Sequence, residues 1–432
     1  MPDDALLADV IAHPDDDAPR LVYADALEGR GDPRGELITV QCELARLGLD
    51  GERLFLEWVG DALADPAALD DGRIARLRRR EAELYRRHGA EWRKDVRRHA
   101  ADDHRVHFRR GFVEHVGWDS YKRLDDGVDR LVEAAPLLRC IDFGTGVRSG
   151  SLNALKAFFA SPALARLREL YPAGAGDFGI RFLSESRTLD ALERLCLVHD
   201  GGAHELGSLA RASFFTRLRG LVLSGFALGA AELEQLVAGP RLAELQLIDC
   251  RLGPGGADSL ARSASLADVR VLCARAARLG PGGALALARR GWTSLAALDL
   301  RNNKLGSDDA AALGASLPTV RVLDVSGNPF GDKGLNGLLE GGGLGELRVL
   351  SLQKTDLGDD AAAALAASPL LGQLRVLDLR KNRICGGGAR VLASSPHLGR
   401  VRTLYIGGNR FTAGEKKALT SSSSLAKTRV HA

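Results

Sequence analysis

The stretch LRVLDLRKNRI, residues 374–384, alternates leucine with polar residues and then reaches an asparagine. The alternation predicts a short strand in which Leu377 and Leu379 point to one face and Asp378 to the other. Asn382 follows the strand, and its side-chain amide can hydrogen-bond the backbone of a neighbouring turn. The stretch therefore predicts one strand and one turn of a larger unit.

The same pattern recurs along the chain from about residue 113. Aligned on the middle apolar residue, it gives twelve copies separated by 24 to 29 residues. Self-similarity at this period is the sequence signature of a solenoid. The aligned residues are Val116, Ile141, Leu170, Leu195, Leu221, Leu245, Leu272, Leu298, Leu323, Leu350, Leu377 and Leu404. The turn residue is Asn303, Asn328, Asn382 or Asn409 in four copies, and Cys250 or Thr355 in two others.

The segment after each turn has a different periodicity. GDDAAAALAAS, residues 358–368, begins with glycine and aspartate, ends before a proline and predicts a short amphipathic helix. One strand and one helix in each repeat resemble the leucine-rich repeats of the ribonuclease-inhibitor type, over about residues 112–411. The resemblance implies an α/β solenoid shaped as a horseshoe, with about twelve strand–helix repeats and a parallel sheet on the concave face.

Residues 1–110 follow other rules and predict an all-helical module. Asp32 is placed as the N-cap and Pro33 as the first residue of a helix over about residues 33–47. Gly29 and Gly31 end the helix before it, and further helices are expected near residues 3–12, 52–64 and 72–89.

The run DDAPRLVYADALEGRGDPRGELITVQCELARL, residues 16–47, resembles the bacterial repeat-companion domain, a module that precedes repeat arrays. The resemblance covers about residues 4–47 and implies no catalytic residues. We therefore expect three parts: a helical repeat-companion domain at 1–110, a leucine-rich repeat solenoid at 111–411, and a C-terminal helix and tail at 412–432.

Charge is polarised within the helical module. Residues 1–72 contain five basic and eighteen acidic residues, whereas residues 73–110 contain fourteen basic and six acidic ones. The two halves are expected to neutralise each other across helix faces. The alternative is a basic nucleic-acid surface over residues 76–110, where Tyr85, Trp92 and Phe108 could stack on bases.

Composition excludes several classes of protein. Hydrophobic residues make up 45% and charged residues 27%, and the net charge of +3 predicts no particular partner. Arginine exceeds lysine throughout, as in GC-rich bacterial genomes. The acidic N-terminus is no signal peptide and no apolar run is long enough to span a membrane, so we expect a cytoplasmic protein. The six cysteines include no CxxC pair, so we expect neither metal nor cofactor.

The charged stretch VYADALEGRGDPRGEL, residues 22–37, is interpreted as a structural joint between two helices. Carboxylates beside arginines stay ionised, which suits a structural network better than general acid catalysis. No histidine, cysteine or serine in the stretch can act as a nucleophile. The joint residues are Arg20, Asp25, Asp32, Arg34 and Glu36.

The concave face of the repeats is the predicted binding site. Side chains that flank the inward leucines form rows there, because neighbouring strands lie about 4.8 Å apart. The residues assigned to this site are Asp299, Arg301, Asp324, Gln353, Asp378, Arg380 and Tyr405. Either they contact a protein partner, or the Asp–Arg pairs only satisfy each other along the sheet.

A second row is purely basic. The residue two positions before the aligned leucine is arginine in eight repeats, and Arg321, Arg348, Arg375 and Arg402 occupy consecutive ones. Either these arginines interact favourably with the negative ends of the helix dipoles, or the ridge attracts an anionic partner.

These observations favour a non-catalytic protein-interaction scaffold or regulator, not an enzyme. The alternatives are a nucleic-acid-associated protein that uses residues 76–110 or the arginine ridge, and a regulator of a partner enzyme.

Overall fold

The computed structural model describes residues 2–47, 49, 72–99, 105–117, 124–143, 152–172, 176–199, 206–421 and 428–431. The chain divides into two compact units, which are unit 1 (Met1–Leu218) and unit 2 (Arg219–Ala432).

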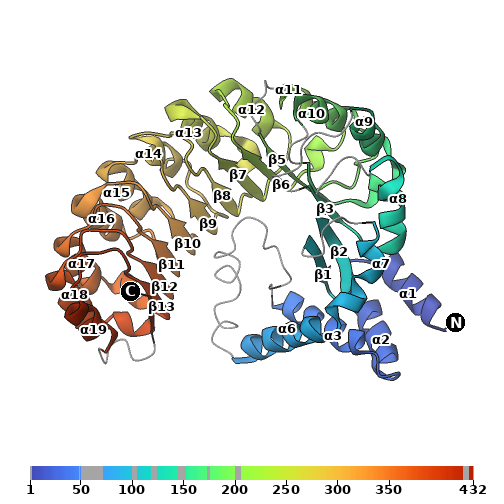
Figure 1. Cartoon of the computed structure of the whole chain (residues 1–432). Coiled ribbons are helices and arrows are strands. Elements are labelled where there is room, and N and C mark those ends of the chain that lie inside the picture. Colours follow the sequence, from blue (N-terminus) through green and yellow to red (C-terminus); the bar gives the residue numbers. More distant parts are fainter. Residues whose placement is uncertain are drawn as a thin grey trace. The chain divides into compact units, whose positions relative to one another are not determined.

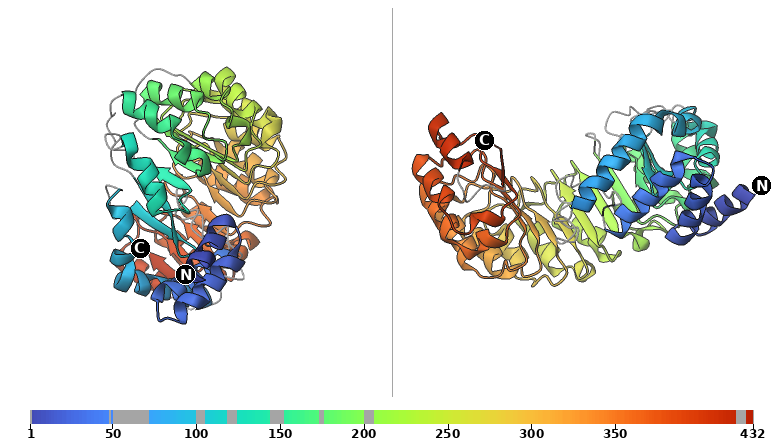
Figure 2. Two further views of the ribbon diagram at one scale, coloured as in Figure 1. Left: turned by 90° about the vertical axis from the view of Figure 1, so that its right-hand side faces the viewer. Right: turned by 90° about the horizontal axis from the view of Figure 1, so that it is seen from below.

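Unit 2 alternates a short strand with a short helix, and the helices lie along one side of its sheet (Figure 1). The same alternation can be followed through two further views (Figure 2). Its strands are β6 (Gly220–Ser224), β7 (Glu244–Ile248), β8 (Val271–Cys273), β9 (Ala297–Asp299), β10 (Val322–Asp324), β11 (Val349–Ser351), β12 (Val376–Asp378), β13 (Thr403–Tyr405) and β14 (Arg429–His431). Its helices are α12 (Ala230–Ala238), α13 (Gly253–Arg262), α14 (Gly283–Ala288), α15 (Ser307–Ser316), α16 (Gly331–Glu340), α17 (Asp359–Ala367), α18 (Gly386–Ala393) and α19 (Ala413–Thr420), with 3-10 turns η5 (Ala264–Leu266), η6 (Pro369–Gln373) and η7 (Leu398–Arg400).

The strand register of unit 2 confirms the repeat alignment. Each strand pairs in parallel with the next, and the aligned leucines from Leu221 to Leu404 are register partners. All eight leucines are buried in the space between sheet and helices. Val430 of β14 is the register partner of Leu404, so the expected tail contributes a further strand.

Asparagine side chains link successive turns, as predicted. The Oδ1 of Asn328 accepts the N–H groups of Asn303 and Leu305 at 2.8 and 3.1 Å. Its Nδ2 donates to the carbonyls of Leu300 and Val325 at 2.9 and 2.8 Å. One buried amide therefore satisfies the backbone of two neighbouring repeats. Corresponding bonds are made by Asn303, Asn382 and Asn409.

A second set of links, at the helix N-termini, was not predicted. The buried carboxylate of Asp309 in α15 accepts the N–H groups of Gly282, Ala284 and Leu285 at 2.9, 2.9 and 3.1 Å. It also accepts the N–H of Gly306 at 3.0 Å. One aspartate therefore caps its own helix and the helix of the preceding repeat, where N–H groups have no partner within the helix.

Unit 1 contains the helical module and the first repeats (Figure 1). The antiparallel strands β1 (Val106–Arg109) and β2 (Phe112–Gly117) are followed by the parallel strands β3 (Cys140–Asp142), β4 (Glu169–Tyr171) and β5 (Arg194–Val198). The helices are α1 (Pro2–Ala12), α2 (Asp17–Glu28), α3 (Pro33–Arg46), α6 (Gly72–Trp92), α7 (Lys94–Arg97), α8 (Leu124–Ala134), α9 (Leu152–Ala160), α10 (Gly176–Glu185) and α11 (Leu206–Leu209), with 3-10 turns η3 (Pro162–Arg166) and η4 (Phe215–Arg217). Val116, Ile141, Leu170 and Leu195 are in register, as aligned.

The helical module packs directly on the first strands. Val10, Ile38 and Cys42 form one buried cluster with Phe112 of β2. Gly111 has a φ of +83°, and a Cβ there would lie 2.0 Å from the Ile38 Cγ1 atom. Only glycine allows this close approach of the hairpin to α3.

One sequence expectation differs in detail from the fold. The expected all-helical region contains one strand, β1, which pairs with β2 and places Phe108 against Tyr85 and Trp92 of α6. The helix expected at 52–64 lies outside the described residues. The boundaries at residues 110/111 and 411/412 stay predictions.

Candidate functional site

The strand face of unit 2, defined as the face turned away from its helices, carries all seven residues predicted for binding. Three of them are carboxylates that face outward between the core leucines. Asp299, Asp324 and Asp378 are nevertheless only 4%, 3% and 6% exposed. Their burial has a local cause, because longer side chains from neighbouring positions cover them.

Arg301 covers the first two carboxylates. Its Nε lies 3.0 and 2.9 Å from the two carboxylate oxygens of Asp299, and its Nη2 lies 2.5 Å from Oδ2. The same Nε is 3.2 Å from the Asp324 Oδ2 atom on the next strand. One guanidinium therefore holds two carboxylates on neighbouring strands, and 24% of its side chain remains exposed.

Arg380 repeats the arrangement three strands further on, after β12. Its Nη2 lies 2.5 Å from the Asp378 Oδ2 atom, and its guanidinium carbon lies 4.8 Å from the centre of the Tyr405 ring. The ring of His431 stacks on Tyr405, with centroids 4.7 Å apart. Guanidinium, phenol and imidazole thus line up across β12, β13 and β14, and 42% of the Arg380 side chain is exposed.

The two middle strands lack a covering arginine. Ser326 and Gln353 occupy the positions that Arg301 and Arg380 hold elsewhere, and the Oγ atoms of Ser326 and Ser351 are 2.8 Å apart. Asp324 therefore shares Arg301 with Asp299. Burial and the charge of Asp299 raise the pKa of Asp324 to about 6, although Arg301 opposes the shift.

From β9 to β13 the exposed predicted residues of the strand face are consequently arginine, glutamine and tyrosine, not aspartate. Arg301, Gln353, Arg380 and Tyr405 are partly exposed, whereas the aspartates lie beneath the arginines. Pairing of Asp with Arg along the sheet, left open by the sequence, is present in the structure. A contact of the aspartates with a partner stays a prediction.

The arginine row, defined here as Arg321, Arg348, Arg375 and Arg402, borders this face. Each residue lies just before a strand, from β10 to β13. The N–H of each arginine donates to the carbonyl of the previous one, at 2.8, 2.7 and 2.8 Å. The four backbones are therefore stacked on consecutive strands. Arg402 is exposed and the other three are half-buried.

In unit 1 the same repeat position is occupied by Arg139 and Arg168, and there a carboxylate is bound. Asp15 lies in the loop between α1 and α2. Its Oδ1 is 2.6 Å from Arg139 Nη1 and its Oδ2 is 2.7 Å from Arg168 Nη2. These contacts join residues 124 and 153 positions apart. No local sequence signal connects them, and sequence reasoning missed them.

The predicted joint has Arg20 at its centre. This residue is fully buried, and its Nη2 lies 2.6 Å from the Glu114 Oε1 atom. It also donates to the carbonyls of Pro14 and Arg110, at 2.8 and 3.1 Å. Its guanidinium lies 5.1 Å from the Phe112 ring. The residue therefore links the helical module to the hairpin.

The other joint residues have separate roles. Asp32 accepts the N–H of Arg34 at 2.9 Å and caps α3, as predicted. The Arg34 guanidinium lies 5.2 Å from the Phe112 ring. Glu36 binds Arg80 of α6, which keeps the pKa of this carboxyl below its usual range. Asp25 is exposed on α2.

The basic segment of the helical module is largely paired within the module. Arg80 donates to Glu36 at 2.6 Å and Arg73 binds Glu43, and both glutamates belong to the acidic segment. Within α6, Arg78 binds Glu81 at 3.0 Å and Arg87 binds Glu83 at 2.6 Å. The rings proposed for base stacking pack against one another, since Tyr85 and Trp92 lie 5.7 and 6.3 Å from Phe108. This geometry favours mutual neutralisation over a free basic face.

Strands β1, β2 and β3 of unit 1 carry a cluster of titratable side chains that sequence reasoning missed. His107 and His115 on β1 and β2 have ring centroids 4.8 Å apart. His115 lies 4.0 Å from Asp142, which binds Arg105 at 2.6 Å. Burial and the neighbouring His107 lower the pKa of His115 to about 4. The imidazole is therefore neutral at physiological pH.

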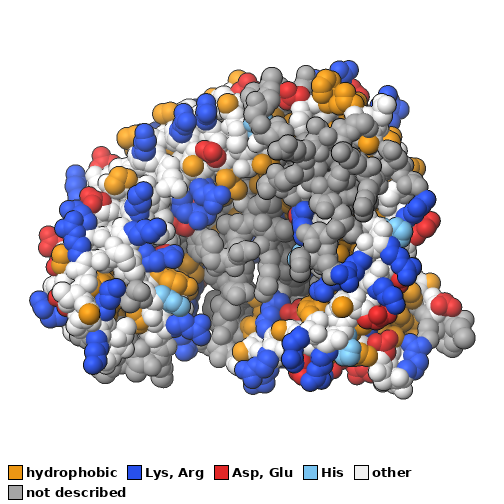
Figure 3. Space-filling view, viewed as in Figure 1, with side chains coloured by type: hydrophobic (Ala, Val, Ile, Leu, Met, Phe, Trp, Pro, Cys, Tyr) orange, Lys and Arg blue, Asp and Glu red, His pale blue; other side chains and the backbone are white. Residues whose placement is uncertain are grey.

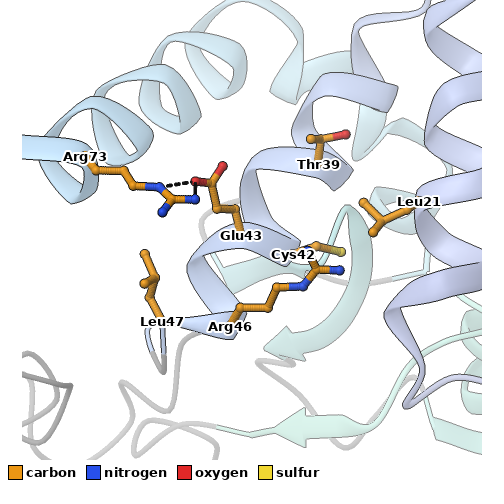
Figure 4. Close-up of a pocket in the computed structure, with 7 residues that line it drawn as sticks. All are labelled: Leu21, Thr39, Cys42, Glu43, Arg46, Leu47 and Arg73. Atoms are coloured by element: carbon orange, nitrogen blue, oxygen red, sulfur yellow. Dashed lines mark hydrogen bonds and ion pairs between the residues drawn. The ribbon is translucent and has the colours of Figure 1, made fainter. Parts of the chain in front are cut away.

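A pocket of about 320 Å³ lies among α2, α3 and α6 (Figure 4). Glu43 and Arg73 form an ion pair at its rim, and Cys42 lies at its base. Burial and the nearby Asp17 raise the pKa of the Cys42 thiol to about 12. The thiol stays protonated, so it is a poor nucleophile.

Within the described ranges, no group of three His, Cys, Asp or Glu side chains could hold a metal ion. None of the helices described is long and apolar enough to cross a membrane.

Comparison with known proteins supports the repeat assignment. A profile described as "Leucine Rich repeat" matches residues 293–314 and 316–339, which include β9, α15 and β10. The chain is similar to an internalin from Listeria monocytogenes, with 18% identity over 79% of this chain and 94% of that chain and a TM-score of 0.46. It is also similar to a chain in the crystal structure of the Rad7 and Elc1 complex in yeast. The identity is 14% over 71% of this chain and 70% of that chain, and the TM-score is 0.43. A search of the curated proteins gives no match. Residues 293–314 and 316–339 therefore match leucine-rich repeats, and the strand register continues the same repeating unit from β6 to β13.

Proposed function

We propose that this leucine-rich repeat protein is a non-catalytic scaffold that holds a partner protein on the strand face of unit 2. The carrying observation is the column of Arg380, Tyr405 and His431, with Arg301 three strands away on the same face. Arginine and tyrosine are the residues that most often anchor protein interfaces. The arginines are also held in place by the buried aspartates, so little side-chain entropy is lost on binding.

The titratable groups support a non-catalytic role. The Cys42 thiol is protonated, the His115 imidazole is buried beside His107, and Asp299 and Asp378 are engaged by arginines. None of these groups combines a free nucleophile with a base in reach. If the partner is an enzyme, the protein acts as its regulator, and this role requires no catalytic group in the protein itself.

The helical module is proposed to be a repeat-companion domain that caps the repeats. Its contacts through Arg20, Asp15 and Phe112 support that role, because the end of a repeat array must be shielded from water. A bacterial, cytoplasmic protein is also proposed. All six cysteines are free thiols, as expected for a reducing compartment.

Co-purification from source cells tests the strand face. The variant Arg380→Ser with Tyr405→Ala removes two anchors, and the serine copies the residue that β10 has at this position. We expect loss of the partner that the wild type retains, confirmed with the purified partner. Lys333→Ser with Lys417→Ser, at exposed positions on α16 and α19, is the matched control. Equal retention by both variants would remove the strand face from the proposal.

The nucleic-acid alternative rests on residues 76–110 or the arginine row. It predicts binding to RNA or DNA that weakens steeply with added salt. The pairing of Arg78 and Arg87 with glutamates gives it less support than the protein scaffold.

A further inference from the structure

The contact between Asp15 and two arginines indicates what the arginine row can bind. Asp15 is 58% exposed, yet each of its carboxylate oxygens meets a different arginine, just before β3 and β4. Arg139 and Arg168 stand two residues before the aligned Ile141 and Leu170. One aspartate therefore bridges two neighbouring strands at this position of the repeat.

Unit 2 presents the same position four times in succession. Arg321, Arg348, Arg375 and Arg402 stand two residues before Leu323, Leu350, Leu377 and Leu404, and their backbones are bonded in sequence. The row has no acidic or neutral interruption between β10 and β13. It contains the equivalent arginine pair twice, and Arg348 in addition lies 3.4 Å from Glu346, two residues before it.

Charge is segregated towards the same end of unit 2. Residues 219–374 contain fifteen basic and sixteen acidic residues, whereas residues 375–432 contain twelve basic and two acidic ones. Lys and Arg side chains accordingly gather over the last repeats, around α18 and α19 (Figure 3). Arginine-rich codon usage would act on both segments alike, so it does not explain this difference.

We infer that the arginine row binds an acidic, extended segment of the partner protein, with one carboxylate bridging Arg321 and Arg348 and a second bridging Arg375 and Arg402. The inference rests on the proposed function, since it names the chemistry of the partner. A carboxylate is favoured over a phosphate because a carboxylate already bridges the equivalent pair in unit 1.

The spacing of the row specifies the segment. Two arginine pairs are two strands apart, which is about 9.6 Å for strands that lie about 4.8 Å apart. A polyproline II chain has three residues per turn and rises about 3.1 Å per residue, so positions i and i+3 share a face and lie about 9.3 Å apart. The row therefore fits acidic residues separated by two others, as in Glu-Pro-Pro-Glu.

Fluorescence anisotropy at low ionic strength tests this fit. The probes are two labelled peptides of the same composition, one containing Glu-Pro-Pro-Glu and one containing Glu-Glu-Pro-Pro. We expect the full-length protein to bind the first about tenfold more tightly, because only it can bridge both pairs. Equal affinities would overturn the inference.

Charge-matched variants distinguish binding by the arginine row from attraction by the overall positive charge of the protein. Arg348→Glu with Arg375→Glu should abolish the preference, and Arg348→Gln with Arg375→Gln repeats the test if the first variant does not fold. Arg400→Glu with Arg410→Glu changes the same charge at exposed positions outside the row and should keep the preference. Equal losses in both would show attraction by net charge only and would contradict a bridging site.

Two further measurements complete the design. A single-stranded uridine-rich RNA is the competing probe. If it binds more tightly than the acidic peptide, and only when the row is intact, the ligand of the row is nucleic acid and the inference is overturned. The Arg380→Ser/Tyr405→Ala variant should still bind the peptide, because it leaves the row unchanged. If the protein binds both peptides equally but still captures its partner, the arginine row is rejected as the binding site and the strand-face proposal stands.

Discussion

Arg20 Nη2 and Glu114 Oε1 lie 2.6 Å apart, and both side chains are almost wholly excluded from water. Arg20 comes from α2 and Glu114 from β2, at positions 94 residues apart. A buried ion pair is costly to form, yet removing one partner leaves the other charge unpaired in the interior. The pair therefore makes docking of the helical module depend on both residues.

Arg20→Ala should lower the free energy of unfolding by about 3–5 kcal/mol, because it leaves the buried Glu114 carboxylate with only Arg139, 3.8 Å away, as a cationic neighbour. Chemical denaturation followed by circular dichroism measures the change. Asp25→Ala, on the exposed side of the same helix, is expected to stay within about 0.5 kcal/mol. The double variant Arg20→Met/Glu114→Leu should be more stable than Arg20→Ala. A double variant that is less stable would contradict the stranded-charge explanation.

Asp309→Ala should destabilise unit 2 by about 3 kcal/mol or more, since four backbone N–H groups lose their acceptor. Asp309→Asn keeps one acceptor oxygen and should lose less. Asp308→Ala changes the exposed neighbour and serves as the control. Hydrogen exchange should locate the loss at α14 and α15. Similar effects of Asp308→Ala and Asp309→Ala would reject the cross-repeat cap.

Asp324 should make unit 2 less stable as pH rises. Its folded pKa of about 6 exceeds the unfolded value of about 3.9, so the folded state holds the extra proton between these values. Stability should therefore fall from about pH 4 to pH 6 and then level off. Asp324→Asn should flatten this part of the profile, measured by denaturation at a series of pH values. An unchanged slope would show that another group titrates there.

His115 should act in the opposite direction in unit 1. Its folded pKa of about 4 lies below the unfolded value of about 6.5, so the unfolded state takes up the proton first as pH falls. The stability that the neutral imidazole confers is complete above about pH 6.5 and is lost towards pH 4. His115→Gln should reduce that loss, and the imidazole NMR signal should titrate near pH 4. A titration midpoint above 6 would contradict burial of the neutral ring.

The repeats could be read from sequence because each one carries its own signal. The apolar residue at the Leu377 position recurs every 24 to 29 residues and asparagine at the Asn382 position recurs in four copies. Burial of the leucine and bonding of the amide need only the next copy of the same pattern. The strand register then follows from the alignment, because equivalent residues of neighbouring repeats become register partners. The Asp309 caps escaped prediction because their partners, such as Gly282, lie in the preceding repeat and carry no side-chain signal.

The candidate sites were only partly predictable. Period-two alternation correctly placed Asp299, Asp324 and Asp378 on the strand face, since side chains alternate along a strand. It could not show that Arg301 and Arg380 would fold over them. That outcome depends on the rotamers of long side chains and on the exchange of water for charged hydrogen bonds.

The amino-acid sequence alone determined the solenoid, its register and the row of arginines, because these follow from local periodicity and from copies of one pattern. The tertiary structure alone decided which charges meet. Asp15 reaches Arg168, and Arg20 reaches Glu114, only after the helices pack on the hairpin around Phe112. Electrostatic pairing depends on distance in space and on burial, and neither quantity is written in the order of residues along the chain.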